Sequence, residues 1–206
     1  MTARAMPTAL PTAMPTALPI GNGVPRSPGW WALIWTIATE ACLFAYLLFS
    51  YYYLASQARG PWPSTGPLSL TLAIPQTCLL VASSVVYWWG EKGIERGDQG
   101  RLRLGLLVTF IMGVVFLILE GLDWNNQPFT AKTDAFGSLY YTITGFHGAH
   151  VIVGLLLNLI VQIWAWRGTF TRERHLAVTN AGMYWHFVDV VWLFVFTTFY
   201  LTPRWG

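Results

Sequence analysis

Three histidines and an aspartate stand inside apolar stretches near the end of this sequence. His147 and His150 lie in one stretch, and His186 and Asp189 lie in the next. An ionised side chain at the centre of a membrane helix costs about 2.5–3.5 kcal/mol on insertion scales. Such residues are usually retained for pairing, metal binding or proton transfer. They are therefore the first candidates for function.

His147 and His150 are three residues apart, so they share one face of a helix. Together with His186 they could offer three nitrogens to a metal ion. However, the sequence has only four histidines, and the fourth, His175, lies in a loop. We therefore expect neutral imidazoles hydrogen-bonded to neighbouring helices, with no metal ligands. We also expect no catalytic residues, because no phosphate-binding glycine loop and no CxxC motif is present.

His186 and Asp189 also share a helix face, near the start of the last apolar stretch. A buried aspartate needs a hydrogen-bond donor or becomes neutral. His186 is the expected partner, or one of the first two histidines across the bundle. The pattern favours a polar clamp between the fourth and fifth helices.

Glu40 stands in the middle of the first apolar stretch, about 15 Å from its start at 1.5 Å per residue. No Lys or Arg lies inside any apolar stretch to neutralise it. The carboxyl group could be a member of a proton relay or a packing hydrogen bond, and both interpretations stay open. Glu120 and Asp123 lie at the end of the third stretch, where we expect them to be near solvent as interfacial anchors.

Five stretches have the roughly 20 apolar residues that a helix needs to cross the hydrocarbon core. They comprise residues 30–53, 68–89, 102–122, 136–166 and 182–201. The composition agrees, because 54% of the residues are hydrophobic and only 10% are charged, against about 25% charged in soluble domains. We predict an all-α, polytopic membrane bundle with five transmembrane helices.

The distribution of Lys and Arg predicts the orientation of these helices. One side holds nine of them: Arg4, Arg26, Lys92, Arg96, Arg101, Arg103, Arg167, Arg172 and Arg174. The other side holds three: Arg59, Lys132 and Arg204. The positive-inside rule then places the N-terminus in the cytoplasm and the C-terminus outside. The net charge of +3 is small and comes from loop residues, with no cluster suited to nucleic acid, so we expect no nucleic-acid partner.

Residues 1–29 differ from the rest of the chain. Proline recurs at every fourth position from Pro7 to Pro19, which prevents a regular helix and favours polyproline II or disorder. We predict a disordered cytoplasmic tail rich in Pro, Thr and Ala, followed by a membrane domain over residues 30–206.

A basic loop separates the last two apolar stretches. It contains Arg167, Arg172, Arg174 and His175. These residues could bind anionic lipid headgroups, or the arginines could serve only to set the topology. We take Arg167, Arg174 and His175 as the lipid-binding candidates.

Two motifs resemble signatures of subunit III of the haem-copper oxidases. The first is GFHGAHVIVG at residues 145–154, and the second is YWHFVDVVW at residues 184–192. Thr39 and Glu40 are similar to the Ser-Glu pair of that family's acidic helix. The resemblance covers about residues 30–201, with both motifs in the expected order and spacing.

The resemblance implies a non-catalytic subunit in the plasma membrane of a bacterium. Its main partner would be subunit I, which carries haem and copper and reduces oxygen. Subunit II, a small subunit IV and phospholipids would be further partners. No haem or metal is implied in this chain. Its role would be to stabilise subunit I and to support proton uptake during aerobic electron transport.

Individual residues take expected roles from the same resemblance. Glu40 corresponds to the mid-membrane acid of the family. His147, His150, His186 and Asp189 correspond to the polar core that joins the last two helices. Arg167 and His175 fall near positions associated with lipid headgroups.

The chain also departs from the family pattern. Many members have seven helices, with a lipid cleft between the first two and the other five, whereas five are predicted here. Thr179 stands where members often carry a glutamate.

We expect cytochrome c as the electron donor. The alternatives are a quinol oxidase subunit, an accessory protein of nitric oxide reductase, and an independent metal-binding membrane enzyme.

Overall fold

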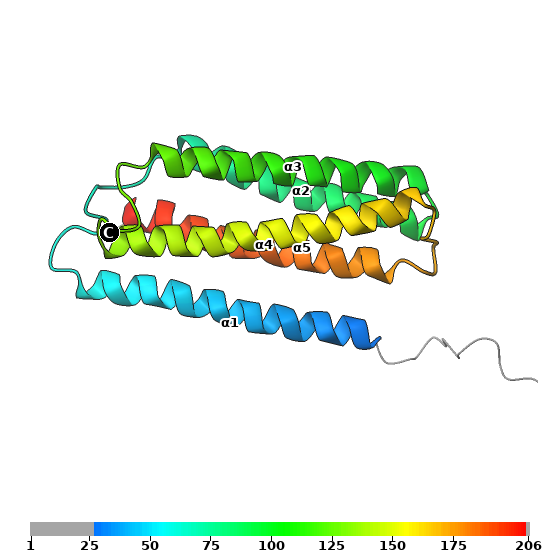
Figure 1. The fold of residues 1–206 in the computed structure, drawn as a ribbon, viewed down its shortest axis with the longest axis horizontal. Coiled ribbons are helices and arrows are strands. Elements are labelled where there is room, and N and C mark those ends of the chain that lie inside the picture. The colour runs from blue at the N-terminus through cyan, green and yellow to red at the C-terminus, as the bar shows by residue number, and fades with distance from the viewer. Residues whose placement is uncertain (1–26, 205–206) are drawn as a thin grey trace, which may run out of the picture.

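The computed structural model describes residues 27–204, and within them it forms five long helices (Figure 1). They are α1 (Pro28–Gln57), α2 (Leu70–Glu95), α3 (Gln99–Asn126), α4 (Ala135–Trp166) and α5 (Leu176–Phe196). A π-helical turn, η1 (Thr197–Leu201), and a 3-10 turn, η2 (Thr202–Arg204), continue α5. All five helices are long and apolar enough to cross a membrane. The predicted all-α bundle with five spans is therefore confirmed.

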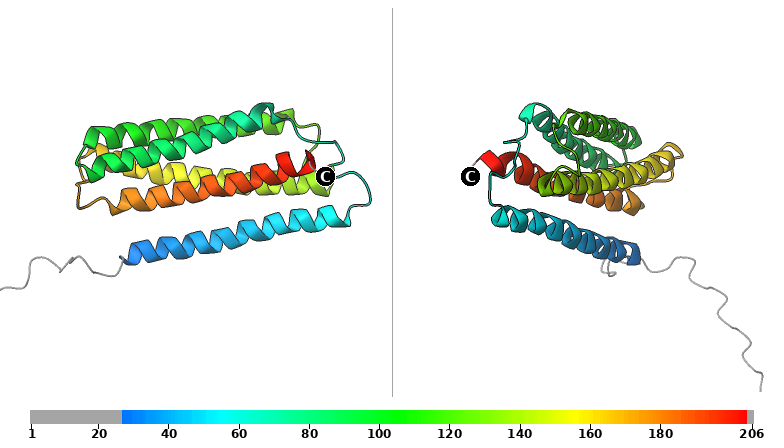
Figure 2. Two further views of the ribbon diagram at one scale, coloured as in Figure 1. Left: turned by 180° about the vertical axis from the view of Figure 1, so that it is seen from behind. Right: turned by 60° about the vertical axis from the view of Figure 1, so that its left-hand side comes forward.

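The helices run alternately up and down, but they are not packed equally (Figures 1 and 2). α2 packs on α3 and α5, and α4 packs on α3 and α5, which makes a four-helix core. α1 lies along one side of this core and contacts α4 and α5. Its buried residues are Phe44 and Tyr51.

Side-chain caps begin four of the helices. Ser27 accepts a hydrogen bond from the backbone of Trp30, and Ser69 accepts one from that of Thr71. Asp98 accepts from the backbone of Arg101, and Asp134 from that of Gly137. Such caps satisfy backbone N–H groups that have no partner within the helix. α1 begins at Pro28, so the last two residues of the predicted tail, 28 and 29, belong to this helix. Residues 1–26 of that tail lie outside the described part of the chain.

Glycines let the core helices approach closely. A Cβ atom on Gly105 would lie 2.7 Å from Cα of Gly90, so α2 and α3 meet backbone to backbone. Gly113 and Gly154 face the ring of Trp185, where a Cβ atom would come within 2.7 Å and 2.9 Å. Close backbone approach is a main source of helix association in membranes, so these contacts fix the core that positions the ionisable residues.

Candidate functional site: ionisable residues paired between helices

Glu40 of α1 is paired with His150 of α4. Oε2 of Glu40 lies 2.9 Å from Nε2 of His150, and the ring of Phe44 packs edge-on against the imidazole at 5.0 Å. Nδ1 of His150 lies 2.7 Å from the carbonyl oxygen of Phe146. A carbonyl oxygen only accepts, so Nδ1 carries a proton.

The contact between Glu40 and His150 therefore needs a second proton. Either an imidazolium donates it to a carboxylate, or a carboxylic acid donates it to a neutral imidazole. In both states one proton lies between the two residues. His150 is 110 residues from Glu40 in the sequence, so spacing alone does not reveal it as the partner of that carboxyl group.

His147 connects α4 to α5. Its Nε2 lies 3.2 Å from the carbonyl oxygen of Val188, to which it donates, and its ring packs between those of Phe116 and Trp192. The side chain is fully buried, and Nδ1 has no hydrogen-bond partner among the described residues. This contact is the helix–helix hydrogen bond expected for a buried neutral imidazole.

His186 and Asp189 of α5 meet at Ser84 of α2. The hydroxyl of Ser84 lies 2.8 Å from Nδ1 of His186 and is also hydrogen-bonded to Oδ2 of Asp189. The expected clamp between α4 and α5 is therefore made by His147, whereas His186 and Asp189 connect α5 to α2. Likewise His150 contacts α1 rather than α5. Ser84 was missed because it stands in a run of small residues that favours helix packing.

Glu120 and Asp123 are buried, with about 3% of each exposed, so the prediction that they lie near solvent is wrong. Asp123 Oδ2 accepts from the hydroxyls of Tyr140 at 2.7 Å and Tyr200 at 2.6 Å, and from the amide of Gln127 at 3.2 Å. Tyr200 comes from η1, so the turn that continues α5 brings a donor to this end of α3. Hydropathy gives no sign of that contact.

Glu120 lies one helical turn before Asp123 and accepts hydrogen bonds from a separate set of donors. Its Oε2 accepts from the amide of Gln76 at 3.2 Å, and its Oε1 accepts from the indole of Trp124 at 3.1 Å. Trp124 also donates to Thr144 of α4. These bonds join α2, α3 and α4 at one end of the bundle.

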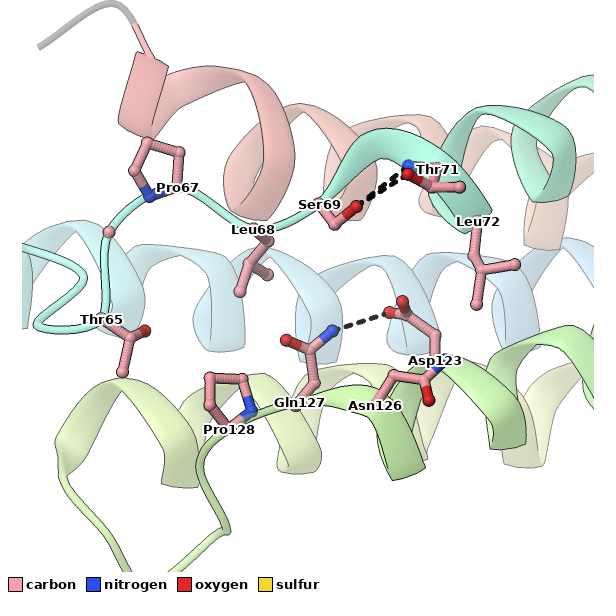
Figure 3. A pocket seen from close by; sticks show the side chains of 11 residues that line it. Thr65, Pro67, Leu68, Ser69, Thr71, Leu72, Asp123, Asn126, Gln127 and Pro128 are labelled. Atoms are coloured by element: carbon pink, nitrogen blue, oxygen red, sulfur yellow. Dashed lines mark hydrogen bonds between the residues drawn. The ribbon is translucent and has the colours of Figure 1, made fainter.

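A cavity of about 330 Å³ opens beside Asp123 at this end (Figure 3). Its wall is formed by the segment that leads into α2, including Thr65 and Ser69, and by the end of α3. Figure 3 shows Gln127 reaching to the carboxylate of Asp123 at this wall. The donors around Asp123 come from three elements, so this carboxylate has a clear structural role.

The basic loop residues lie where α4 ends and α5 begins. Arg167 is the C-cap of α4, and Arg174 is exposed further along the loop, just before His175. His175 is half-buried, and its Nδ1 lies 3.3 Å from the carbonyl oxygen of Thr171. Neither arginine forms an ion pair with a carboxylate in the described part of the chain.

Residues 27–204 contain no group of three or more His, Cys, Asp or Glu side chains placed to hold a metal ion. The ionisable residues instead form pairs and small networks across helix contacts. The molecule is thus a multi-pass membrane bundle in which buried acids and histidines form hydrogen bonds to residues of neighbouring helices.

Comparison with known proteins agrees with this class. The family model described as cytochrome c oxidase subunit III matches residues 28–206. The chain belongs to the haem-copper oxidase subunit III family, as the two motifs predicted. A subunit of this kind implies a complex with other oxidase subunits.

Similar proteins occur in bacteria and in animals. The probable cytochrome c oxidase subunit 3 of Nocardia farcinica is 37% identical over 172 residues, which cover 82% of this chain and 84% of the relative. That of Mycobacterium leprae is 35% identical with the same coverage of both chains. The human cytochrome c oxidase subunit 3 is 33% identical over 177 residues, which cover 82% of this chain and 68% of the relative.

Proposed function

We propose that this chain is the non-catalytic subunit III of a terminal oxidase that receives electrons from cytochrome c. It binds to subunit I in the plasma membrane of a bacterium, beside subunit II, and stabilises subunit I during turnover. Haem and copper belong to the partner subunits. The names of the relatives support this assignment, because those compared above are cytochrome c oxidase subunits 3.

The pair of Glu40 and His150 supports a role in proton supply. The two side chains share one proton at the contact between α1 and α4. A shared proton inside a membrane helix bundle is the chemistry of a relay. The positive-inside rule places the start of α1 at the cytoplasmic side, so the pair lies partway along the route from the cytoplasm into the membrane.

The assignment also includes phospholipid headgroups at the loop between α4 and α5. Arg167 and Arg174 are exposed there without a carboxylate partner in the described structure. The charge of the loop suits the anionic lipids of the cytoplasmic leaflet, and His175 lies next to the second arginine.

Purification of the tagged chain in mild detergent tests the assignment as a whole. We expect a complex with haem absorption, in which haem remains with a larger partner after dissociation. A second copper-bearing subunit besides subunit I supports cytochrome c as the donor, and its absence favours quinol. Haem or metal retained by this chain alone would overturn the proposal.

Glu40→Gln tests the role in proton supply. Glutamine keeps a hydrogen bond to His150, because its amide donates to Nε2, but it cannot release that proton. We expect normal assembly, a several-fold faster loss of oxidase activity during turnover, and slower proton uptake at high pH. Glu95→Gln is the matched control, because Glu95 pairs with Lys92 at the half-exposed end of α2. Unchanged kinetics in a fully assembled Glu40→Gln complex would exclude the relay.

A further inference from the structure

Ser84 places the ionisable residues of α5 in one continuous hydrogen-bond chain. Its Oγ contacts both Nδ1 of His186 and Oδ2 of Asp189, so the three side chains form a line across the α2–α5 contact. The line lies on a different helix pair from Glu40 and His150. Neither the family motifs nor the proposed function assigns a role to Ser84.

A serine hydroxyl has one proton to donate, so the line has two complete arrangements when Asp189 and His186 share one acidic proton. In the first, Asp189 is a carboxylic acid that donates to Ser84, and Ser84 donates to Nδ1 of a neutral His186. In the second, an imidazolium at His186 donates to Ser84, and Ser84 donates to the carboxylate of Asp189. Two short proton shifts through Oγ convert one arrangement into the other, and no proton is gained or lost.

The surroundings favour the neutral arrangement at rest. Asp189 is 5% exposed, and its Oδ1 is buried without a hydrogen-bond partner among the described residues. An ionised carboxylate would leave that oxygen charged and unpaired, which is costly in a low-dielectric interior. The ion-pair arrangement is therefore the higher-energy state, reached when His186 takes the proton.

His186 is the end of the line that can exchange protons. Its side chain is half-buried, and only Nδ1 is used within the described chain. The ring of Tyr87 packs edge-on at 6.0 Å, but its hydroxyl donates to the carbonyl oxygen of Val178 and is not available. Glu91 is seven residues beyond Ser84 on α2, and so two turns along the same face, toward the predicted cytoplasmic end.

We infer that His186, Ser84 and Asp189 form a second proton-holding unit, in which Asp189 stores a proton and Ser84 passes it to and from His186. The unit rests on the proposed function for its purpose, which is to supply protons beside the oxidase core. Its chemistry is independent of that purpose, because it depends only on the three side chains.

Infrared and ¹⁵N NMR spectra of the purified complex test the unit. In the wild-type complex we expect a protonated carboxyl band that Asp189→Asn removes, together with a His186 Nδ1 that accepts a hydrogen bond. Ser84→Ala should shift the carboxyl band to higher frequency and remove the hydrogen-bond shift of His186. Ser84→Thr keeps the hydroxyl and should restore both signals.

Ser83→Ala is the matched control. The hydroxyl of Ser83 donates to the carbonyl oxygen of Leu80 and accepts from the indole of Trp185, without contact to the unit. An ionised Asp189 beside a neutral His186, or spectra that Ser84→Ala leaves unchanged, would overturn the inference. Should Ser84→Ala fail to assemble, the wild-type, Asp189→Asn and Ser84→Thr spectra still decide it. The haem content of the same samples tests the proposed function separately.

Discussion

α1 and the four-helix core are held in different ways. The core helices meet through glycines that bring backbones together, and through buried polar networks that cross three elements. α1 touches the core at a few points along its length, among them the pair of Glu40 and His150, the ring of Phe44, an aromatic group around Tyr51, and the hydroxyl of Tyr52 against Thr198. Most of its other residues are exposed or half-buried.

This difference matters because lipid is as apolar as leucine. A helix gains little from moving its apolar side chains out of lipid, so close packing and polar contacts decide which helices stay together. The core has both kinds of contact, whereas α1 depends on a small number of side chains. We therefore expect single substitutions to loosen α1 locally and to destabilise the core globally.

The largest effect is expected in the core from Asp123→Leu. This change leaves the buried hydroxyls of Tyr140 and Tyr200 without their acceptor, at about 1–3 kcal/mol for each unsatisfied group. The two hydroxyls are 3.1 Å apart and can partly satisfy each other, so we expect a loss of about 3 kcal/mol. Thermal unfolding of the complex measures it.

Asp123→Asn separates loss of the acceptor from loss of the charge. Asparagine retains a carbonyl oxygen for the tyrosines, so most of the stability should remain. Equal losses for Asp123→Leu and Asp123→Asn would contradict a role based on acceptance of these hydrogen bonds. They would point instead to the charge itself.

A smaller effect is expected at the aromatic anchor of α1. The ring of Tyr51 packs edge-on against Trp62, Phe136 and Phe199, with ring centroids 5.0–6.2 Å apart. Each aromatic pair contributes about 0.5–1.5 kcal/mol. Tyr51→Ala should therefore lower the free energy of opening of α1 by about 1–2 kcal/mol, so that the helix opens more often. Hydrogen exchange measured by mass spectrometry should show faster exchange in α1 alone.

Phe49→Ala is the control for this site. Phe49 is on the same helix but is 63% exposed, so its removal should leave exchange nearly unchanged. Faster exchange in α4 and α5 as well would show that α1 is part of the core rather than a separately attached helix.

The fold could be predicted from sequence because the dominant signal is the length of apolar runs. Five runs gave five helices in the right order, and the ends differed by a few residues. The two largest errors were at the end of α2, which is Glu95 and not Trp89, and at the start of α5, which is Leu176 and not Gly182. Thr179 and Asn180 lower the hydropathy there, but a helix accommodates them readily when they are half-buried against the bundle.

The residues of the site could be found, but their partners could not. Glu40, His150, His186 and Asp189 were conspicuous because they are ionisable groups in apolar helices. Their contacts depend on how the helices rotate about their axes and on which pairs are adjacent. Spacing along the chain does not contain that information. Ser84 lies 105 residues from Asp189, and a serine in an apolar helix carries no signal of its own.

The smallest effect is expected for the coupling between Glu40 and His150. Hydrogen bonds between membrane helices average about 0.6 kcal/mol in double-mutant cycles. We expect a similar coupling free energy from Glu40→Ala, His150→Ala and the double variant, read from hydrogen exchange in α1. So weak a coupling would mean that α1 hardly needs this pair for attachment, although an ionisable group in a membrane is costly. A role in moving the shared proton then explains its presence better than packing does. A coupling above about 1.7 kcal/mol, the largest found in such cycles, would reverse that conclusion and make the pair a structural clamp.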